Sequence, residues 1–316
     1  MTDSTLKLAL PQLAPAWLNR EAGTAIVLKT IQEASENNAD LIVFSEGFIP
    51  GYPFWLSATG GAEFNSERQK QIFAHYSDQA VTIEDGHLDS ICSALKDAEM
   101  AAYVGIIERP TDRAGHSLYC SLVYIDQSGE IQSVHRKMRP TYEERLAWSP
   151  GDGHGLRTHR LGNFTVGGLN CWENWMPLAR AALYAQGEDL HVACWPGSKR
   201  NTDDLTPVLA KEGRSYVVSV SALMRPSDVR DDTPFADEIR SALAEPAADG
   251  GSCVAAPDGS WVLPPVTDVE GIRYCQLDPA MVRRERQNFD PSGHYSRPDV
   301  TRLIVNRERQ SIAEFR

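Results

Sequence analysis

The sequence predicts an α/β protein with one main domain. Two kinds of segment alternate along the chain. Some have the pattern of strands, in which apolar residues either alternate with polar ones or form a continuous run; in the others, the apolar residues have the spacing of one helix face. Gly-containing turns join some strands directly, so hairpins accompany the strand-to-helix crossovers. The 316 residues, 42% of them hydrophobic and 23% charged, suffice for a core without disulfide or metal support.

In the first half of the chain, apolar spacing predicts strands and helices in alternation. Val27, Ile31 and Ala34 lie on one face of a helix, and the apolar run LIVFS at 41–45 is typical of a buried strand that ends just before Glu46. The other expected elements are strands at 6–10, 101–107, 118–126 and 130–136, and helices at 66–80 and 87–99.

The second half continues the alternation and adds a hairpin. We expect strands at 164–170, 190–195, 216–223 and 272–277, helices at 177–187 and 203–213, and a hairpin of 252–256 with 261–263. The acidic, Pro-containing segment 225–250 is expected to be an exposed loop with a short helix. Residues 301–316 carry charges of both signs and are expected to form a C-terminal tail.

Charge and cysteine usage bound the class of protein. The net charge of −12 argues against nucleic-acid and membrane partners. No apolar run reaches about 18 residues, and the first ten residues lack the pattern of a signal peptide. The six cysteines include no CxxC pair, so we expect reduced core cysteines and a cytoplasmic protein.

Cys171, in GGLNCWENWMPLAR, is the candidate nucleophile. It follows an apolar strand and precedes a helix, and a helix N-terminus lowers the pKa of a thiol. An isolated cysteine is more often a small buried hydrophobe, but the glycines before it and the polar and aromatic residues after it argue against that interpretation.

Charged residues at two other strand ends could assist a thiol. Glu46 ends a buried strand, where a carboxylate is costly unless paired, and it could act as a general base and acid; a loop or helix-capping carboxylate is the alternative. Lys137 could stabilise negative charge on a substrate, although such a lysine is usually a solvated surface residue. Glu144 could hold this ammonium and orient water; taken alone, it would be a helix surface residue.

Other kinds of site have less support. His154 and His159 lie in a Gly-rich stretch without nearby acidic ligands, so we expect no metal site. There is no GxSxG elbow for a serine triad, and the glycines near 151–155 and 167–168 form neither GxGxxG nor a P-loop.

Long segments of the chain resemble the nitrilase superfamily of carbon–nitrogen hydrolases, specifically its true nitrilase branch. The segments are LIVFSEGFIPGYPFW, HRKMRPTYEERLAWSPGDG, GGLNCWENWMPLARAALYAQGEDLHVACWPG and DPSGHYSRPDV, and they occur in the family's order over nearly the whole chain. The run CWEN after the strand resembles nitrilases rather than amidases or carbamoylases.

The resemblance implies a four-layer α-β-β-α sandwich, with a hydrolase domain over 1–300 and a tail over 301–316. It implies Cys171 as nucleophile, Glu46 as general base and acid, Lys137 as electrostatic stabiliser and Glu144 as a positioning residue. It implies no metal or organic cofactor. The sequence departs from many relatives in its SEGF motif and in its short C-terminal extension, which affect the expected pocket and assembly respectively.

These residue types suit nitrile hydrolysis. A thiolate attacks the weakly electrophilic nitrile carbon better than water does. Lys137 and the backbone N–H of Trp172 would stabilise the charged intermediates, and two waters would yield a carboxylic acid and ammonia. We expect aromatic and apolar pocket walls, from Tyr52, Trp55, Trp172, Trp195 and Pro196, with core packing as the alternative for Trp55 and Trp195.

Several functions remain open at this level. The same residues could serve an amidase, a carbamoylase or a cyanide-hydrolysing enzyme, and a non-catalytic assembly protein could retain the fold. The resemblance also implies a homodimer or larger helical homo-oligomer that pairs through the helix at 177–187. We expect the face of Leu178, Ala181, Ala182 and Ala185 to allow close approach of two copies.

Overall fold

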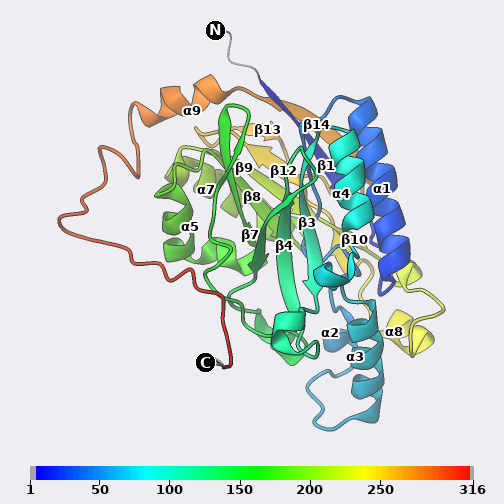
Figure 1. Ribbon diagram of the computed structural model, residues 1–316. Helices are drawn as coiled ribbons and strands as arrows, with labels where there is room; N and C mark the ends of the chain where they lie inside the picture. Colours follow the sequence, from blue (N-terminus) through cyan, green and yellow to red (C-terminus); the bar gives the residue numbers. More distant parts are fainter. Residues whose placement is uncertain (1–4, 314–316) are drawn as a thin grey trace.

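Two mixed β-sheets pack face to face and are covered by helices on their outer faces (Figure 1). The computed structural model describes residues 5–313. Helices α1 and α4 cover the first sheet, and α5 and α7 cover the second, so the layers run α-β-β-α. This arrangement confirms the predicted α/β class and four-layer sandwich.

The first sheet has the strand order β14-β1-β2-β3-β4-β5. Its strands are β1 Leu6–Gln12, β2 Leu41–Val43, β3 Ala101–Glu108, β4 Tyr119–Ile125, β5 Ile131–Arg136 and β14 Gly271–Leu277. Strands β2 and β3 are parallel, whereas β4 is antiparallel to both β3 and β5. Strands β2 and β5 therefore run in the same direction, and their carboxyl ends lie at the same edge of the sheet.

The second sheet has the order β13-β12-β9-β8-β7-β6, with β7, β8 and β9 parallel. Its strands are β6 His159–Leu161, β7 Phe164–Asn170, β8 Leu190–Trp195, β9 Tyr216–Ser221, β12 Cys253–Ala255 and β13 Trp261–Leu263. The Glu46 N–H donates to the Trp195 carbonyl at 3.3 Å. This bond joins the carboxyl ends of β2 and β8, so strand ends from both sheets meet in one place.

The helices match the predicted segments and add several shorter ones. They are α1 Arg20–Glu36, α2 Trp55–Ala58, α3 Glu67–Gln79, α4 Asp89–Asp97, α5 Pro177–Tyr184, α6 Lys199–Thr202, α7 Leu205–Gly213, α8 Ala236–Ala242 and α9 Pro279–Arg286. The Asn19 side chain caps α1 by accepting from the Ala22 N–H at 2.9 Å, which satisfies a donor that the helix cannot. Apolar spacing did not reveal α2, α6 or α9, of which α2 and α6 are single turns.

The main core lies between the sheets and is built from alternating strand residues. Leu8 and Leu10 of β1 meet residues such as Val166, Val192 and Val218 of the second sheet, all fully buried. A Cβ at Gly168 would lie 3.0 Å from Leu122 Cδ2 and 3.1 Å from the Val192 carbonyl oxygen. The glycine before the nucleophile segment thus lets β7 pack closely against its neighbours.

The acidic segment 225–250 is more ordered and less exposed than expected. It contains α8, and it closes with a two-stranded sheet of β10 Leu223–Met224 and β11 Ala248–Asp249. Ile239 is fully buried and belongs to the same apolar cluster as Trp17 and Trp55. A few apolar residues among many charges are enough to dock this segment on the body of the molecule.

The C-terminal segment leaves α9, swings outward on the left of the view and then returns to the lower part of the molecule (Figure 1). No helix or strand is assigned to its described part, residues 301–313; residues 314–316 of the predicted tail lie outside the described range. The Arg309 guanidinium pairs with Asp152 at 3.0 Å and donates to the Val134 carbonyl of β5 at 3.0 Å. The tail therefore contacts the strand that leads to Lys137.

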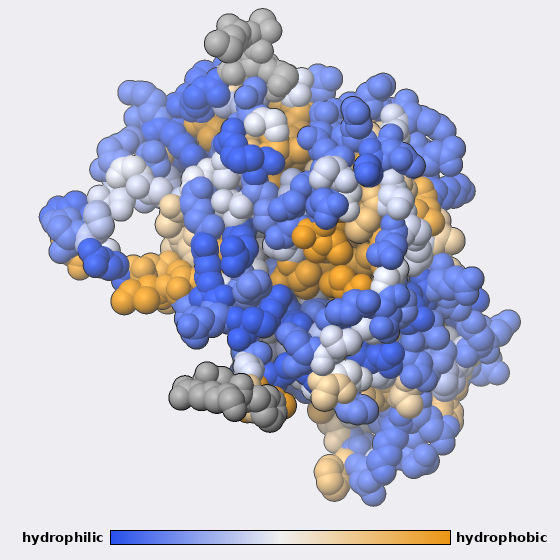
Figure 2. Space-filling model, viewed as in Figure 1, coloured by the Kyte–Doolittle hydropathy of each residue, from blue (hydrophilic) through white to orange (hydrophobic). Residues whose placement is uncertain are grey.

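The surface seen in Figure 2 is mostly hydrophilic, with a hydrophobic patch near α4 and β3. Among the described residues, no helix has both the length and the apolar character needed to cross a bilayer.

Candidate active site

The segment that carries Glu46 crosses closely over β3. A Cβ at Gly105 would lie 2.0 Å from the Ser45 carbonyl oxygen and 2.7 Å from the Gly47 nitrogen, so only glycine allows this crossing. Gly47 itself has a φ of 57°, in the left-handed region. The turn buries the Glu46 side chain, which is 1% exposed.

Lys137 follows β5 and is held by its backbone on both sides. Its N–H donates to the Cys120 carbonyl at 2.7 Å, and its own carbonyl accepts from the Gly151 N–H at 2.8 Å. The side chain is 1% exposed, and Nζ donates to Glu46 Oε1 and to Glu144 Oε2, each at 2.7 Å. Lys137 is thus a buried cation between two carboxylates rather than a solvated surface charge.

Glu144 lies on the short 3₁₀ helix η3, Tyr142–Leu146. Its Oε2 also accepts from the Thr141 N–H at 2.6 Å, and its Oε1 accepts from the Tyr52 hydroxyl at 2.8 Å. These bonds fix Glu144 with one oxygen on Lys137 and leave little freedom for the carboxylate to rotate.

Cys171 is the first residue of the 3₁₀ helix η4, Cys171–Trp175, directly after β7. Its φ of 49° is unusual for a residue other than glycine. The side-chain amide of Asn174 supports the turn by donating a hydrogen bond to the Cys171 carbonyl at 2.8 Å. One ligand-type atom each from Cys171, Glu46 and Glu144 lie within 4.8 Å of one another. The structure therefore brings all four predicted polar residues together.

The charges in this cluster set the protonation states. Burial raises the pKa of Glu46 to about 7, although Lys137 acts in the opposite direction. Burial, and then the charge of Glu46, raise the pKa of Cys171 well above its ordinary value. The sequence-based expectation of a lowered thiol pKa is therefore wrong in direction, because burial outweighs the backbone N–H of Trp172 at the start of η4.

The thiol consequently needs a base. Glu46 Oε1 is bonded to Lys137, while Oε2 is buried without a hydrogen-bond partner. Burial alone would lower the pKa of Lys137, but the charges of Cys171, Glu46 and Glu144 raise it well above its usual value. The cluster thus combines a protonated thiol, a carboxylate with a free oxygen and a permanent cation.

Glu46, Glu144 and Cys171 are also residue types that bind metal ions, and their grouping is compact. However, Lys137 Nζ already donates to both carboxylates at 2.7 Å. The positive charge that a metal would bring is thereby supplied by the ammonium. This arrangement fits general acid–base and nucleophilic chemistry.

A cavity of about 670 Å³ opens over Cys171 and Glu144. Of the predicted wall residues, Tyr52, Trp172 and Pro196 line it. Trp55 and Trp195 are not among its lining residues, which corrects the expectation for both. The remaining lining residues include Phe54, Ser57, Thr141, Tyr142, Glu143, Trp175, Arg200 and Asn201.

The two excluded tryptophans have structural roles. Trp55 is fully buried and packs edge-on against Tyr76, with ring centroids 4.7 Å apart. The Trp195 indole N–H donates to Ser219 Oγ at 3.3 Å, while its carbonyl accepts from the Glu46 N–H. Trp195 thus supports Glu46 through its backbone and not the cavity through its ring.

Sequence reasoning missed Glu173, which ties two parts of the site together. Its carboxylate accepts hydrogen bonds from the Met138 N–H at 2.6 Å and from the Asn170 N–H at 3.0 Å. It is also hydrogen-bonded to His135 Nε2 at 3.0 Å. Burial alone would raise the pKa of Glu173, but these partners outweigh it and lower the pKa. The spacing of Asn170 and Glu173 has the form of a capping box, a signal by which Glu173 could have been found.

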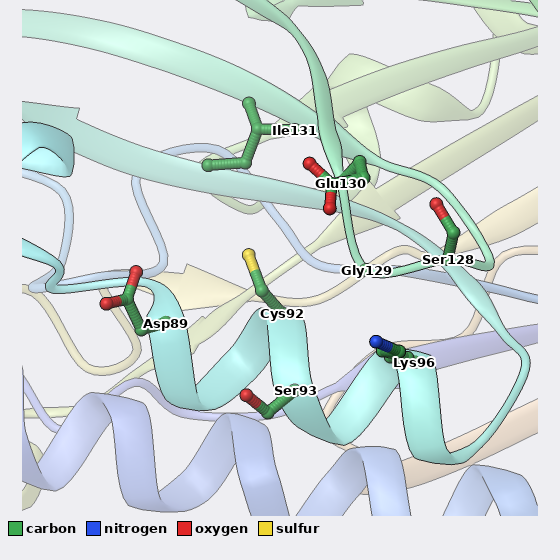
Figure 3. Close-up of a pocket in the computed structure, with 8 residues that line it drawn as sticks. All are labelled: Asp89, Cys92, Ser93, Lys96, Ser128, Gly129, Glu130 and Ile131. Atoms are coloured by element: carbon green, nitrogen blue, oxygen red, sulfur yellow. The ribbon is translucent and has the colours of Figure 1, made fainter.

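A second cavity of about 530 Å³ lies between α4 and the turn before β5 (Figure 3). Cys92 projects into it from α4, with Asp89 and Glu130 nearby. Burial and these two carboxylates raise the pKa of Cys92. Cys92 is only partly buried, so this cavity lacks the buried thiol–base–cation grouping of the first.

Comparison with known proteins gives a consistent result. The profile of the carbon-nitrogen hydrolase family matches residues 7–287. Nitrilase 2 of an unknown prokaryotic organism is 34% identical over 98% of this chain and 95% of its own length. A nitrilase of Pseudomonas syringae pv. syringae is 35% identical, over 95% of this chain and 90% of its own length. An aliphatic nitrilase of Rhodococcus rhodochrous is 31% identical over 98% of this chain and 82% of its own length.

Solved structures support the fold. A carbon-nitrogen hydrolase from Helicobacter pylori G27 superposes with a TM-score of 0.68 at 16% identity, covering 95% of this chain and 100% of that one. An amidase from Nesterenkonia sp. superposes with a TM-score of 0.64 at 17% identity, covering 91% of this chain and 96% of that one. At these identities, the likeness concerns the fold alone.

Proposed function

The chain belongs to the carbon–nitrogen hydrolase family, in its true nitrilase branch, and we propose that it hydrolyses an organic nitrile to a carboxylic acid and ammonia. The observation that carries this proposal is the buried grouping of a protonated thiol, an unpartnered carboxylate oxygen and an ammonium, in which the thiol residue, Cys171, lines a cavity. Full-length relatives named nitrilase support the same substrate class.

In the first half of the reaction, Cys171 becomes bonded to the substrate carbon. Glu46 Oε2 accepts the thiol proton, Sγ attacks the nitrile carbon, and the proton passes to the nitrile nitrogen to give a thioimidate. The free Oε2 and the raised pKa of Glu46, which makes its carboxylate a stronger base, support this transfer, whereas the raised pKa of Cys171 acts against it.

In the second half, two waters complete the hydrolysis. The first adds to the thioimidate with Glu46 as base, and cleavage of the C–N bond releases ammonia and leaves a thioester. The second water cleaves the C–S bond, which releases the acid and restores the thiol. Lys137 Nζ and the Trp172 N–H, which acts to lower the pKa of Cys171, are assigned to stabilise charge in these steps.

Glu144 is assigned a positioning role in this scheme. It accepts from Lys137, Thr141 and Tyr52, and it lines the cavity. We assign substrate contact to the three predicted wall residues that line the cavity, Tyr52, Trp172 and Pro196.

A substrate panel tests the proposal. Aliphatic, aromatic and arylacetonitriles, the corresponding amides and hydrogen cyanide would each be incubated with the protein, and ammonia, acid and amide would be measured. We expect acid and ammonia from at least one organic nitrile and slower release from its amide. Turnover of amides or cyanide alone would overturn the assignment.

We also propose that the protein forms at least a homodimer. Trp175, Met176 and Leu178 lie next to one another in sequence at the start of α5, and they are 52%, 37% and 68% exposed. Such a contiguous apolar patch is typical of an interface. Of the face expected from the sequence, Leu178 and Ala185 are exposed, whereas Ala182 packs inside the subunit with Leu169 and Leu183.

The remaining assignments are proposals of location and boundary. The cysteines are unpaired, and the assigned nucleophile must stay reduced, so we place the protein in the cytoplasm. We assign 1–300 to the hydrolase domain and 301–316 to the tail, since the family match ends at residue 287 and the described part of the tail, 301–313, is a docked segment without a helix or strand.

A further inference from the structure

A second thiol lies within the buried cluster and has no part in the chemistry described above. Cys120, on β4, is 1% exposed, and its Sγ lies 3.4 Å from Glu46 Oε1, to which it donates a hydrogen bond. Its carbonyl accepts from the Lys137 N–H at 2.7 Å. Cys120 therefore contacts two of the proposed catalytic residues without lining the cavity.

We propose that Cys120 is a positioning residue, which together with Lys137 occupies Glu46 Oε1, directs Oε2 to the nucleophile and favours the ionised form of the carboxylate. The inference rests on the proposed function in so far as Glu46 is the base there. Cys120 acts through Glu46, because its thiol donates its hydrogen bond to Glu46 Oε1.

The division of donors between the two oxygens of Glu46 supports this role. Oε1 receives Lys137 Nζ at 2.7 Å and Cys120 Sγ at 3.4 Å, whereas Oε2 receives none. A partial rotation of the carboxylate would break both bonds, whereas a half-turn only exchanges two equivalent oxygens. The two donors thus fix the plane of the carboxylate, so that one oxygen holds both donors and the other remains a free acceptor for the thiol proton of Cys171.

Cys120 remains a hydrogen-bond donor because its thiol keeps its proton. Burial, and then the charge of Glu46, raise the pKa of Cys120 well above its ordinary value. A donor to the ionised carboxylate stabilises that form, and the bond from Cys120 acts to lower the pKa of Glu46 against the effect of burial. The thiol thereby keeps more of Glu46 ionised at neutral pH.

Other groups around Glu46 also influence its ionisation and would be unchanged by substitution of Cys120. They are Lys137 after β5, Glu144 on η3, Cys171 on η4, Tyr52 after β2 and Tyr76 on α3. Cys194 on β8 is the internal control, since it is a fully buried thiol whose Sγ bonds the Phe44 carbonyl instead of Glu46. Burial raises the pKa of Cys194 well above its ordinary value, so this thiol carries no charge that could act on Glu46 at neutral pH.

The test compares Cys120→Ala, Cys120→Val and Cys120→Ser with Cys194→Ala and the unmodified protein. Two pH profiles are recorded: kcat/KM for a nitrile, and the rate of iodoacetamide alkylation of Cys171, located by mass spectrometry. Loss of the hydrogen bond from Cys120 should raise the pKa of Glu46. The acid limb of each profile, where the rate falls as Glu46 becomes protonated, should therefore move to higher pH by about half a unit or more in the Ala and Val variants. The Ser variant, which retains a donor, should keep its limb nearer to that of the unmodified protein.

The controls separate this role from simple packing. Cys194→Ala should leave the acid limb unmoved, and circular dichroism would verify folding; Cys120→Val retains more volume than Cys120→Ala if the latter unfolds. An unmoved limb in the Cys120 variants, or an equal shift in Cys194→Ala, would overturn the inference. If no nitrile is hydrolysed but the alkylation limb still shifts, the proposed function fails and the role of Cys120 stands.

Discussion

Cys171 is the residue on which the proposed chemistry depends most directly. Five other cysteines are present, but only Cys120 also contacts Glu46 with its sulfur, and it does not line the cavity. We predict that Cys171→Ala lowers nitrile turnover below about one ten-thousandth of the original rate, because no other thiol can form the covalent intermediate. Mass spectrometry of enzyme quenched during turnover should find the adduct on Cys171. An adduct on another cysteine would refute the assignment.

Glu46 gives the reaction its expected pH dependence. Its pKa of about 7 means that the carboxylate becomes protonated, and so loses its basicity, as the pH falls through about 7. We predict that kcat/KM declines on the acid side of this value, measured at constant ionic strength. Glu46→Gln should lower the rate by about 10²–10⁴-fold at all pH values, since an amide accepts no proton. A Gln variant with normal turnover would remove Glu46 from the mechanism.

At the scale of elements, Glu173 links η4 to the end of β5. One carboxylate holds the N–H groups of Asn170 and Met138, the neighbours of Cys171 and Lys137 respectively. The distance between nucleophile and cation thus depends on a side chain that meets neither the thiol nor the ammonium in any described bond.

We predict that Glu173→Gln lowers kcat by about ten- to a hundredfold while changing KM little. An amide has one acceptor oxygen and cannot serve all the present donors, so the two segments would shift relative to each other. Glu108→Gln is the matched control, because Glu108 is another buried carboxylate, bonded to Arg136 and without a bond to η4. Equal losses of kcat in both variants at equal thermal stability would argue against a positioning role for Glu173.

At the scale of the whole molecule, the chain end packs against the segment that precedes the site. Asp152 accepts from the Arg309 side chain and from the Gln310 N–H, while Arg309 also reaches Val134 of β5. Bonds from a distant part of the sequence therefore join β5 to the loop whose Gly151 N–H holds the Lys137 carbonyl.

We predict that Arg309→Ala lowers the free energy of unfolding by about 1–3 kcal/mol and lowers kcat several-fold. Denaturant titration and steady-state kinetics would measure the two effects. Arg307→Ala is the matched control, because only the Arg307 backbone carbonyl contacts His154 in a described bond. The same loss in both variants would show that charge alone, and not the contact with Asp152, is responsible.

Assembly is the largest-scale prediction. We predict a light-scattering mass of at least twice the 35.0 kDa of the chain, and a shift toward the monomer in Leu178→Arg, because a charge would enter an apolar interface. Lys29→Glu, a charge change on the helix α1 that covers the opposite face of the sandwich, serves as the control. A fully active 35.0 kDa monomer would contradict the proposal.

Sequence alone was enough to predict most elements and the four polar residues that the structure brings together. Alternation and apolar runs are local consequences of which side chains face a core, so strands such as β3 and β7 are visible without a structure. Glu46, Lys137 and Cys171 stood out because each is a reactive or charged side chain next to a predicted strand end, and Glu144 because it follows Lys137 in a motif that resembles the same family.

Only the tertiary structure decided how these residues act. The direction of the Cys171 pKa shift depends on burial and on the nearby Glu46, two quantities that sequence spacing does not contain. The same holds for Trp55 and Trp195, which are close to the site in sequence but point into cores, and for Cys120, whose contact with Glu46 spans 74 residues. Local patterns determine which face of an element is apolar, whereas solvation and contact between distant strands arise only when the two sheets pack together.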